Sequence, residues 1–468
     1  MIPAKTFSDK TVAVMGLARS GQSSVLSLLA GGAKVIAWDD NAAKCNEIAG
    51  LGAEIRDLRC EKFDVIDALV LSPGIPHSFP EPHQVVKNAR DSGVPIIGDL
   101  EIFANNYKQA SVVGVTGTNG KSTTTALIGH LLSRLDVDND VAGNIGRPVL
   151  EISSKGKASL QVLELSSYQL ELAPSLQCKI GILLNISPDH LDRHGGMGGY
   201  VNAKRRLFDS LTPTSLAIIG VDDERTSNIY DEMRRKRGFS VVAVSGKYVP
   251  TNGVGIENKV IKSKVSGKLT SIANLSDCKT LVGDHNYQNA AAAAAVAISL
   301  GFSSDVIDPA LLSFEGLPHR QEVVRESHGV SFVNDSKATN ADAAERALSS
   351  YSTIYWIAGG LSKEGGVRSL VNNLEHVRHV FLIGSSADEF FEEFNAKVPC
   401  TKCRDLKNAV ELATAAALKK NNDSSVVLLS PAAASFDQFN SYEDRGDLFR
   451  SLVSALKLND IKKHEGRL

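Results

Sequence analysis

The stretch Val112-Val-Gly-Val-Thr-Gly-Thr-Asn-Gly-Lys-Ser-Thr-Thr-Thr125 reads as a buried β-strand, a glycine-rich turn and the start of a helix. Such a turn directs backbone N–H groups toward an anion, and the helix N-terminus adds a partial positive charge. Five residues separate Gly114 from Gly120, one more than in the usual phosphate loop, and Gly117 lies between them. The stretch therefore predicts a nucleotide-binding loop, with ATP as the first candidate, rather than a plain strand-to-helix corner.

Four side chains in and after this stretch suit phosphate chemistry. Lys121 is placed to reach the outer phosphates of a nucleotide, and the hydroxyl of Ser122 is placed to bind Mg²⁺. Glu164 ends one later strand, and His190 follows another. Because parallel strands present ligands at their carboxyl ends, we expect these side chains to meet at one edge of the sheet. Taken singly, the glutamate also fits a solvated carboxylate and the histidine a structural role.

Strands and helices alternate along the chain, which is the pattern of α/β domains with parallel sheets. We predict a Rossmann-like N-terminal domain at 1–107, a central P-loop ATPase domain with a parallel sheet at 108–314, and a C-terminal Rossmann-like α/β domain at 315–468. The alanine-rich run at 289–297 predicts a packed helix, because alanine is the best helix former. The polar stretch at 246–279 predicts loops and short strands. The expected strands lie near 11–16, 35–39, 68–74, 112–115, 161–165, 181–185, 330–334, 353–358, 379–384 and 425–430.

Composition limits the remaining function classes. The chain has 468 residues, 43% of them hydrophobic and 22% charged, and a formal net charge of −2, so we expect no nucleic-acid partner. Residues 1–10 are too polar for a signal peptide, and no apolar run approaches the length of a membrane span. Cys400 and Cys403 form a lone C-x-x-C without a second pair, so we do not expect metal or redox chemistry there. We expect a monomer in the reducing cytoplasm.

The first domain carries a weaker nucleotide signal of its own. Gly16-Leu-Ala-Arg-Ser-Gly21 is a G-x-A-x-x-G variant, and Asp39 and Asp40 follow about twenty residues later. Alone, this pattern favours NAD and leaves open a dehydrogenase. However, the alanine adds a methyl group where a pyrophosphate would approach the backbone. A nonenzymatic nucleotide-binding protein is also open at this point.

Further segments resemble, in order, the motifs of the ATP-dependent Mur ligase family. The resemblance extends from about residue 10 to about residue 452. It implies that ATP phosphorylates a substrate carboxylate, which gives an acyl phosphate and ADP. An amine then attacks the acyl phosphate and forms an amide and phosphate. Cations must neutralise the crowded oxygens during both steps. The matching segments are the phosphate loop, the Glu164 strand, Asp189-His-Leu-Asp-Arg193, Tyr200-Val-Asn-Ala-Lys204, Asp284-His-Asn-Tyr-Gln-Asn289, Gly316-Leu-Pro-His-Arg320 and Asn334-Asp-Ser-Lys-Ala-Thr-Asn340.

The resemblance also implies a role for each matching residue around ATP and two Mg²⁺ sites. Ser122 and Glu164 would hold one Mg²⁺, and His190 and Lys204 the second. An ammonium cannot bind Mg²⁺, but the lysine at this position is carbamylated in the family, which makes it an oxygen-bearing anion. That reaction needs neutral amine, a rare species at an ordinary lysine pKa. The implied ATP contacts are Gly117, Thr118, Asn119, Gly120, Lys121, Ser122, Thr123, Asn286, Asn289, Arg320, Asp335 and Lys337.

The substrate residues implied by the resemblance fall in all three domains. The first domain would bind a UDP-linked substrate, UDP-N-acetylmuramoyl-L-alanine, through Arg19, Ser20, Asp39, Ser72 and Gly74, and Asn144 and His190 would lie near its carboxylate. The D-glutamate contacts would be Thr339, Lys363, Ser435, Phe436 and Tyr442. A dicarboxylic amino acid needs a fixed positive charge, which Lys363 would supply.

Third-domain segments bear on the acceptor amino acid. Asp335-Ser-Lys-Ala-Thr-Asn340, Gly359-Gly-Leu-Ser-Lys363 and Ser430-Pro-Ala-Ala-Ala-Ser-Phe-Asp-Gln-Phe439 resemble the members that add D-glutamate, and the Asp-Asn-Pro-Arg signature of the diaminopimelate- or lysine-adding relative is absent. Two positions depart from the family pattern, since phenylalanine is common at Tyr442 and leucine at Phe436. These two changes bear on side-chain contacts more than on substrate identity. A related ligase with another acceptor is the alternative, and the third-domain segments argue against it.

Overall fold

The structure is a computed structural model. In it the chain folds into two compact units. The first unit comprises Met1–Asp277 and Asn286–Phe314, and the second comprises Cys278–His285 and the chain from Glu315 onward. The residues described are 1–108, 111–152, 159–236, 238–265, 267–278, 280–362, 366–419 and 424–457.

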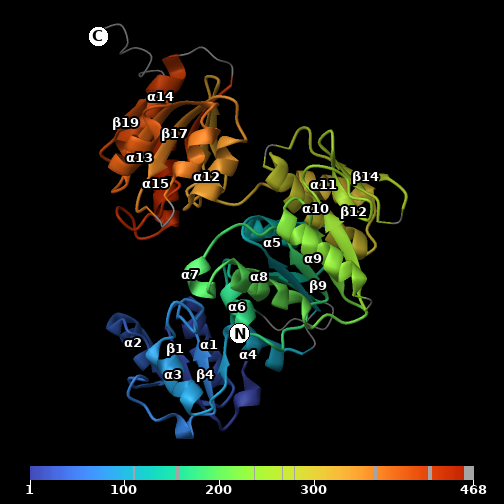
Figure 1. Cartoon of the computed structure of the whole chain (residues 1–468), viewed down its shortest axis with the longest axis vertical. Coiled ribbons are helices and arrows are strands. Elements are labelled where there is room, and N and C mark those ends of the chain that lie inside the picture. Colours follow the sequence, from blue (N-terminus) through green and yellow to red (C-terminus); the bar gives the residue numbers. More distant parts are fainter. Residues whose placement is uncertain are drawn as a thin grey trace. The chain divides into compact units, whose positions relative to one another are not determined.

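A five-stranded parallel sheet forms the N-terminal part of the first unit (Figure 1, blue). Its elements are η1 (Lys5–Phe7), β1 (Thr11–Met15), α1 (Arg19–Ala30), β2 (Lys34–Trp38), α2 (Ala42–Ala49), β3 (Glu54–Ile55), η2 (Phe63–Val65), β4 (Ala68–Leu71), α3 (Gln84–Asp91), β5 (Ile96–Ile97) and α4 (Asp99–Asn106). The strand order is β3-β2-β1-β4-β5, and every neighbouring pair is parallel. Helix α1 packs against β1 and β2. This order places the turn after β1 beside the loop after β4.

The rest of the first unit is built on a nine-stranded sheet. Its strands are β6 (Ser111–Thr116), β7 (Asn139–Gly143), β8 (Leu160–Glu164), β9 (Ile180–Leu183), β10 (Leu216–Gly220), β11 (Ser240–Val244), β12 (Gly253–Glu257), β13 (Val260–Ser263) and β14 (Thr270–Asn274). They lie in the order β14-β13-β12-β11-β10-β9-β6-β8-β7. The pairs from β7 to β12 are parallel, whereas β13 is antiparallel to both its neighbours. The predicted parallel sheet is confirmed, with an antiparallel edge made by the polar stretch.

Helices cover this central sheet, and the buried residues of one of them are mostly alanine. They are α5 (Lys121–Arg134), η3 (Val149–Glu151), α6 (Ser167–Glu171), α7 (Leu191–His194), α8 (Met197–Arg205), η4 (Arg206–Phe208), α9 (Glu224–Arg235), α10 (Asp284–Ser299) and α11 (Ser304–Leu312). Helix α5 packs against β7 and β8, and α9 against β10 and β11. Ala290 to Ala297 of α10 are all buried, so the prediction of a packed helix is confirmed.

The second unit contains a six-stranded sheet in the order β15-β16-β20-β17-β18-β19 (Figure 1, orange and red). Its elements are β15 (Glu322–Ser327), β16 (Val330–Asn334), α12 (Ala341–Leu348), β17 (Ile354–Gly359), η5 (Arg368–Asn373), β18 (Val377–Ile383), α13 (Ala387–Phe394), β19 (Cys400–Lys402), α14 (Leu406–Lys419), β20 (Ser425–Leu429) and α15 (Tyr442–Ala455). All pairs are parallel except β15 with β16. Trp356 and Ile357, neighbours on β17, belong to different hydrophobic clusters, because side chains alternate across a strand and both faces are covered.

Three α/β regions with largely parallel sheets confirm the predicted fold class. Within the first unit, one hydrophobic cluster contains residues of the first sheet and of the central sheet, for example Val14 and Leu163, with Phe103 of α4. This shared core explains why the two regions form one compact unit. The domain limits 1–107, 108–314 and 315–468 stay predictions. Among the described residues, no helix is long and apolar enough to cross a membrane.

Candidate active site

The phosphate loop joins β6 to α5, as the sequence predicts. Gly117 and Gly120 have φ of 155° and 82°, values that favour glycine. A Cβ atom on Gly120 would lie only 2.4 Å from Oδ1 of Asn289. Ser122 is buried and Thr123 half-buried in the first turn of α5. The glycines are therefore required by backbone conformation and by the close approach of α10.

Bonds from the loop after β9 hold the phosphate loop in place. The backbone N–H of Thr118 donates to the carbonyl of Asn185 at 2.8 Å, and the backbone N–H of Asn119 donates to Oδ1 of Asn185 at 2.9 Å. The Thr118 hydroxyl lies 3.1 Å from the hydroxyl of Tyr200. Nζ of Lys121 donates to the carbonyl oxygens of Gly117 and Thr118 at 3.0 and 2.7 Å. The predicted phosphate-binding lysine thus lies against the loop itself.

Glu164 lies beside the phosphate loop because of strand register. It pairs with Val115 of β6 on one side and with Gly143 of β7 on the other. The side-chain amide of Asn144 donates to Oε1 of Glu164 at 2.8 Å. The second carboxylate oxygen, Oε2, is buried and has no hydrogen-bond partner among the described residues. An ionised oxygen in that position is costly unless a cation binds it.

Lys204 is also buried at this edge of the sheet, with 1% of its surface exposed. Its Nζ donates to the carbonyl of Gly117 at 2.7 Å and lies 4.5 Å from the ring centroid of Tyr200. Burial lowers the pKa of Lys204 well below its ordinary value, and the neighbouring charge of Lys121 lowers it further. Asp189 and Glu164 act in the opposite direction. These electrostatic neighbours show that Lys121, Glu164 and Lys204 are brought together.

His190 begins helix α7 in a left-handed conformation, with φ of 53°. A histidine in this region is uncommon, and such backbone strain occurs at functional sites. Its ring lies 5.3 Å from that of Tyr168, and its Nε2 is 3.5 Å from Oδ2 of Asp189. The side chain is 46% exposed. The strained position therefore presents the ring to solvent beside a residue that also faces Lys204.

The donor set fits one Mg²⁺ better than two. No group of three or more His, Cys, Asp or Glu side chains that could hold a metal occurs in the part of the chain that the structure describes. Ser122 and Glu164 offer a hydroxyl and a carboxylate with an unpaired oxygen, which suits a hard cation completed by phosphate and water oxygens. His190 and an unmodified Lys204 offer no oxygen. The second predicted site therefore depends on modification of Lys204.

The two asparagines expected near adenine are buried in α10. The Asn289 side-chain amide donates to Oδ1 of Asn286 at 3.1 Å, and the Thr124 hydroxyl donates to Oδ1 of Asn289 at 3.0 Å. Through Thr124 they are joined to the helix that follows the phosphate loop. This packing role is observed; contact with a base stays a prediction.

The first-domain residues expected to bind the UDP group lie at the carboxyl ends of β1, β2 and β4. Oδ2 of Asp39 accepts the backbone N–H of Leu17, and Oδ1 accepts that of Asn41, so its carboxylate organises the two turns. The Ser72 hydroxyl donates to the carbonyl of Gly16 at 2.7 Å. Ser20 is half-buried and hydrogen-bonds to Asp99, Arg19 is exposed, and the carbonyl of Gly74 accepts from Arg193.

In the second unit, Arg320 lies between two left-handed residues, His319 and Gln321, with φ of 60° and 44°. Asp335 follows β16, is buried, and accepts from the Ser430 hydroxyl at 2.9 Å and from the Gln321 backbone at 3.2 Å. Burial raises the pKa of Asp335 to about 7, although these hydrogen bonds and the charge of Arg320 act against the shift. The structure thus brings Arg320 and Asp335 together, as the sequence predicts.

Most of the residues expected to bind D-glutamate lie near Asp335. Nζ of Lys337 is 3.7 Å from the ring centroid of Tyr442, and the backbone N–H of Thr339 donates to the carbonyl of Lys337. Ser435 is buried, whereas Phe436 is 70% exposed. Lys363 lies outside the described residues. Their contacts with a substrate stay predictions.

One residue of this region was missed by the sequence analysis. Arg445, on α15, is fully buried and donates to the carbonyl oxygens of Ser336, Ala433 and Ala434 and to the hydroxyl of Ser336. It therefore ties the loop after β16 to the loop after β20, which carries Ser435. Burial lowers the pKa of Arg445 to about 10. Its sequence signal is weak, since an arginine in an amphipathic helix ordinarily faces solvent.

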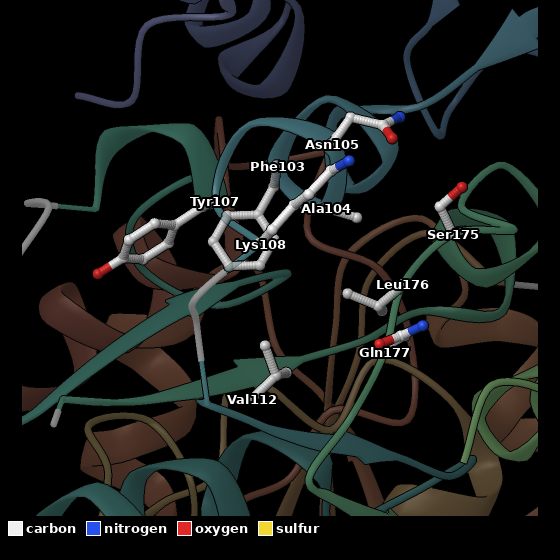
Figure 2. Close-up of a pocket in the computed structure, with 9 residues that line it drawn as sticks. All are labelled: Phe103, Ala104, Asn105, Tyr107, Lys108, Val112, Ser175, Leu176 and Gln177. Carbon is white, nitrogen blue, oxygen red and sulfur yellow. The ribbon is translucent and has the colours of Figure 1, made fainter. Parts of the chain in front are cut away.

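Two other features lie outside this chemistry. Burial raises the pKa of both Cys400 and Cys403 to about 11, so neither thiol is activated for metal or redox chemistry. A pocket of about 340 Å³ lies between α4, the start of β6 and the loop before β9 (Figure 2). It is lined by Phe103, Ala104, Asn105, Tyr107, Lys108, Val112, Ser175, Leu176 and Gln177, none of which was predicted as a site residue.

The raised pKa of Asp335 predicts a pH-dependent stability of the second unit. Below pH 7 the folded unit holds this proton, whereas the unfolded chain releases it above about pH 4, so stability falls as pH rises through that window. We expect the loss to be on the order of a few kcal/mol and to be absent in Asp335→Asn. Urea unfolding can be followed by Trp356 fluorescence in a Trp38→Phe background.

The exposed carboxylate of Asp388 supplies the control for this measurement. Its Asn variant should keep the pH dependence of the parent protein, because its side chain is 85% exposed. A profile for Asp335→Asn that parallels the parent profile between pH 4 and pH 7 would show that Asp335 ionises normally.

Comparisons with known proteins agree with this geometry. The family model described as Mur ligase middle domain matches residues 115–297, which contain the phosphate loop, Glu164, His190 and Lys204. The model described as Mur ligase, glutamate ligase domain matches residues 319–433, which contain Arg320 and Asp335.

Full-length relatives and solved structures extend the match. The UDP-N-acetylmuramoylalanine–D-glutamate ligase of Rhodospirillum rubrum is 44% identical over 461 residues, 97% of both chains. The ligase of that name from Nitrobacter winogradskyi is 46% identical over 460 residues, covering 97% of this chain and 98% of that protein. MurF ligase of Thermotoga maritima in complex with ADP has a TM-score of 0.58 at 17% identity over 99% of this chain and 98% of its own, a likeness of fold. The chain therefore belongs to the Mur ligase family.

Proposed function

We propose that the chain is an ATP-dependent ligase that joins D-glutamate to UDP-N-acetylmuramoyl-L-alanine in the cytoplasmic stage of peptidoglycan synthesis. Relatives that carry the name UDP-N-acetylmuramoylalanine–D-glutamate ligase match nearly the whole chain at 44 to 46% identity. The glutamate ligase domain model supports the acceptor. The acceptor-specific segments of the third region support the same choice.

The observation that carries the proposal is the edge of the central sheet. Two lysines, Lys121 and Lys204, and the half-paired carboxylate of Glu164 meet where β6 enters the phosphate loop. Nucleotide phosphates are anions that would neutralise the positive charges of the two lysines. A divalent cation would bind the carboxylate oxygen of Glu164 that has no hydrogen-bond partner among the described residues. A dehydrogenase that used the first domain would leave this set of charges in the central region unexplained, which argues against that alternative.

The residues of this edge can activate a carboxylate by phosphoryl transfer. Lys121 and the backbone N–H groups of the loop would orient the outer phosphates, with the N-terminus of α5 adding positive charge. Ser122 and Glu164 would hold Mg²⁺, which when bound neutralises phosphate oxygens. The phosphorylated substrate then has a good leaving group in place of oxide. Attack of the D-glutamate amine forms the amide and releases phosphate, and the amine loses a proton.

Lys204 fits the carbamylation that the family resemblance implies. Because burial lowers the pKa of Lys204, a larger share of its amine is neutral than in an exposed lysine, and the lone pair of that amine can attack the carbon of CO₂ with loss of one proton. The product is an anion that would balance Lys121 and provide oxygens beside His190. An unmodified ammonium would instead repel a metal. We propose that Lys204 acts in the carbamylated form.

The acceptor is tested by measuring ADP formation with UDP-N-acetylmuramoyl-L-alanine and a panel of amino acids. We expect D-glutamate to support turnover and L-glutamate, D-alanine, L-lysine and diaminopimelate to be slower by about a hundredfold or more, because buried polar groups penalise a wrong acceptor. Lys121→Ala controls for contaminating ATPase. Equal rates with D- and L-glutamate would remove the acceptor assignment, and turnover of another amino acid would favour the alternative ligase.

Lys204→Ala should lower kcat by about a hundredfold or more, because an oxygen donor to the metal is lost. Acetate or formate added to the variant should restore part of this activity by replacing the carbamate. Lys236→Ala removes an exposed lysine that pairs with Glu232. This control variant should keep full activity, and added acetate or formate should not change its rate. If Lys204→Ala keeps the kcat of the parent protein, Lys204 does not act as a carbamylated metal ligand. The same conclusion follows if the loss of kcat is explained entirely by a lower thermal midpoint of unfolding.

A further inference from the structure

Residues 74–79, which follow β4 in the first domain, contact the elements that carry His190 in the central region. Both belong to the first compact unit. The contacts occur at Gly74, His77 and Phe79, and their partners are Arg193, Glu171 and Gly195. Gly74 is one of the residues expected to bind the UDP-linked substrate. The segment therefore connects the proposed substrate loop to the proposed catalytic edge.

The first contact is made by Arg193, three residues after His190. Its Nη1 donates to the carbonyl of Gly74 at 3.0 Å. Its guanidinium carbon lies 4.8 Å from the ring centroid of Tyr168, whose other neighbours are the rings of His190 and His194 at 5.3 and 5.1 Å. Stacking on an aromatic ring restricts a guanidinium and aligns its donors. Arg193 is thus held in place to fix one carbonyl of the substrate loop.

The second contact is a half-buried carboxylate that lies near two histidines. Oε2 of Glu171 lies 3.7 Å from Nε2 of His77 and 3.3 Å from Nδ1 of His194. His194 is fully buried, and its Nε2 is 2.9 Å from the Ser167 hydroxyl. Its ring also lies 5.4 Å from that of Tyr200, which contacts the phosphate loop. This contact joins residues 74–79 to the same group of rings.

The third contact is steric. A Cβ atom on Gly195 would lie 2.7 Å from Cζ of Phe79, so the ring packs directly against the backbone that ends α7. Gly195 also has φ of 66°, which favours glycine. All three contacts fall on α6, α7 and the residue after α7.

We propose that Arg193 is a positioning residue that fixes the Ser72–Gly74 loop relative to His190, and so sets how the UDP-linked substrate is presented to the phosphate loop. The proposal rests on the function proposed above. Arg193 belongs to the Asp189–Arg193 segment but has no part in the metal and phosphate binding proposed above, and this proposal gives it a role. Arg193 would act through Gly74 and not by touching the reacting atoms.

The kinetic test compares Arg193→Ala, Arg193→Lys and Arg234→Ala. Arg234 is the matched control, an arginine of the same unit that lies 5.6 Å over the ring of Tyr230. We expect Arg193→Ala to raise KM for the UDP-linked substrate about tenfold while KM for ATP stays unchanged, since a charged hydrogen bond and a ring stack are lost. Arg193→Lys should restore part of the loss. A rise in both KM values, or none in either, would overturn the proposal.

Amide hydrogen exchange tests the same contact without reference to activity. In the free protein, Arg193→Ala should speed exchange in peptides covering residues 74–79, whereas Arg234→Ala should leave them unchanged. Unchanged exchange in Arg193→Ala overturns the positioning role even if the ligase activity is established. Faster exchange in Arg193→Ala, together with a wild-type protein that fails to use D-glutamate, would instead retain the contact and refute the proposed function.

Discussion

The carbonyl oxygen of Gly117 accepts hydrogen bonds from both Lys121 and Lys204, at 3.0 and 2.7 Å. Two ammonium groups on one buried carbonyl repel each other, and this repulsion is part of why the pKa of Lys204 is lowered. The arrangement becomes favourable when anions arrive or when one lysine loses its charge. Bound phosphates would therefore stabilise the phosphate loop, and the lowered pKa of Lys204 raises the share of its amine that is neutral.

The rest of the first unit positions groups around that carbonyl. Strand β8 brings Glu164 to one side of β6, and the chain after β9 brings Asn185 and His190 to the other. Asn289 of helix α10 lies so near Gly120 that a Cβ atom there would be 2.4 Å from its Oδ1, and the following turns of the helix pack through buried alanines. A parallel sheet serves this purpose well, because adjacent strands end at the same edge and each can contribute one polar residue.

Much of the fold and of the candidate site could be predicted from the sequence. The features that could not be predicted depend on tertiary contacts. The strand–glycine–helix pattern at 112–125 predicted the phosphate loop, because glycine at φ of 82° has few substitutes. The burial of Lys204 could not be predicted, since Arg205 and Arg206 beside it suggest an exposed helix face. Arg445 was overlooked because its partners are mainly backbone carbonyls, which carry no sequence signal, and the hydrogen bond of Arg193 likewise goes to the carbonyl of a distant residue, Gly74. The left-handed backbone at His190 likewise depends on tertiary contacts.

The most direct test of the account is the effect of Mg²⁺ on ATP affinity in the parent protein and in Glu164→Gln, measured by calorimetry. Glutamine keeps the acceptor for Asn144 but removes the charge from the unpaired oxygen. The account predicts that Mg²⁺ strengthens ATP binding by about tenfold or more in the parent and has little effect in the variant. An equal Mg²⁺ dependence in both proteins would contradict the assignment of Glu164 to the metal and, with it, the proposed active site.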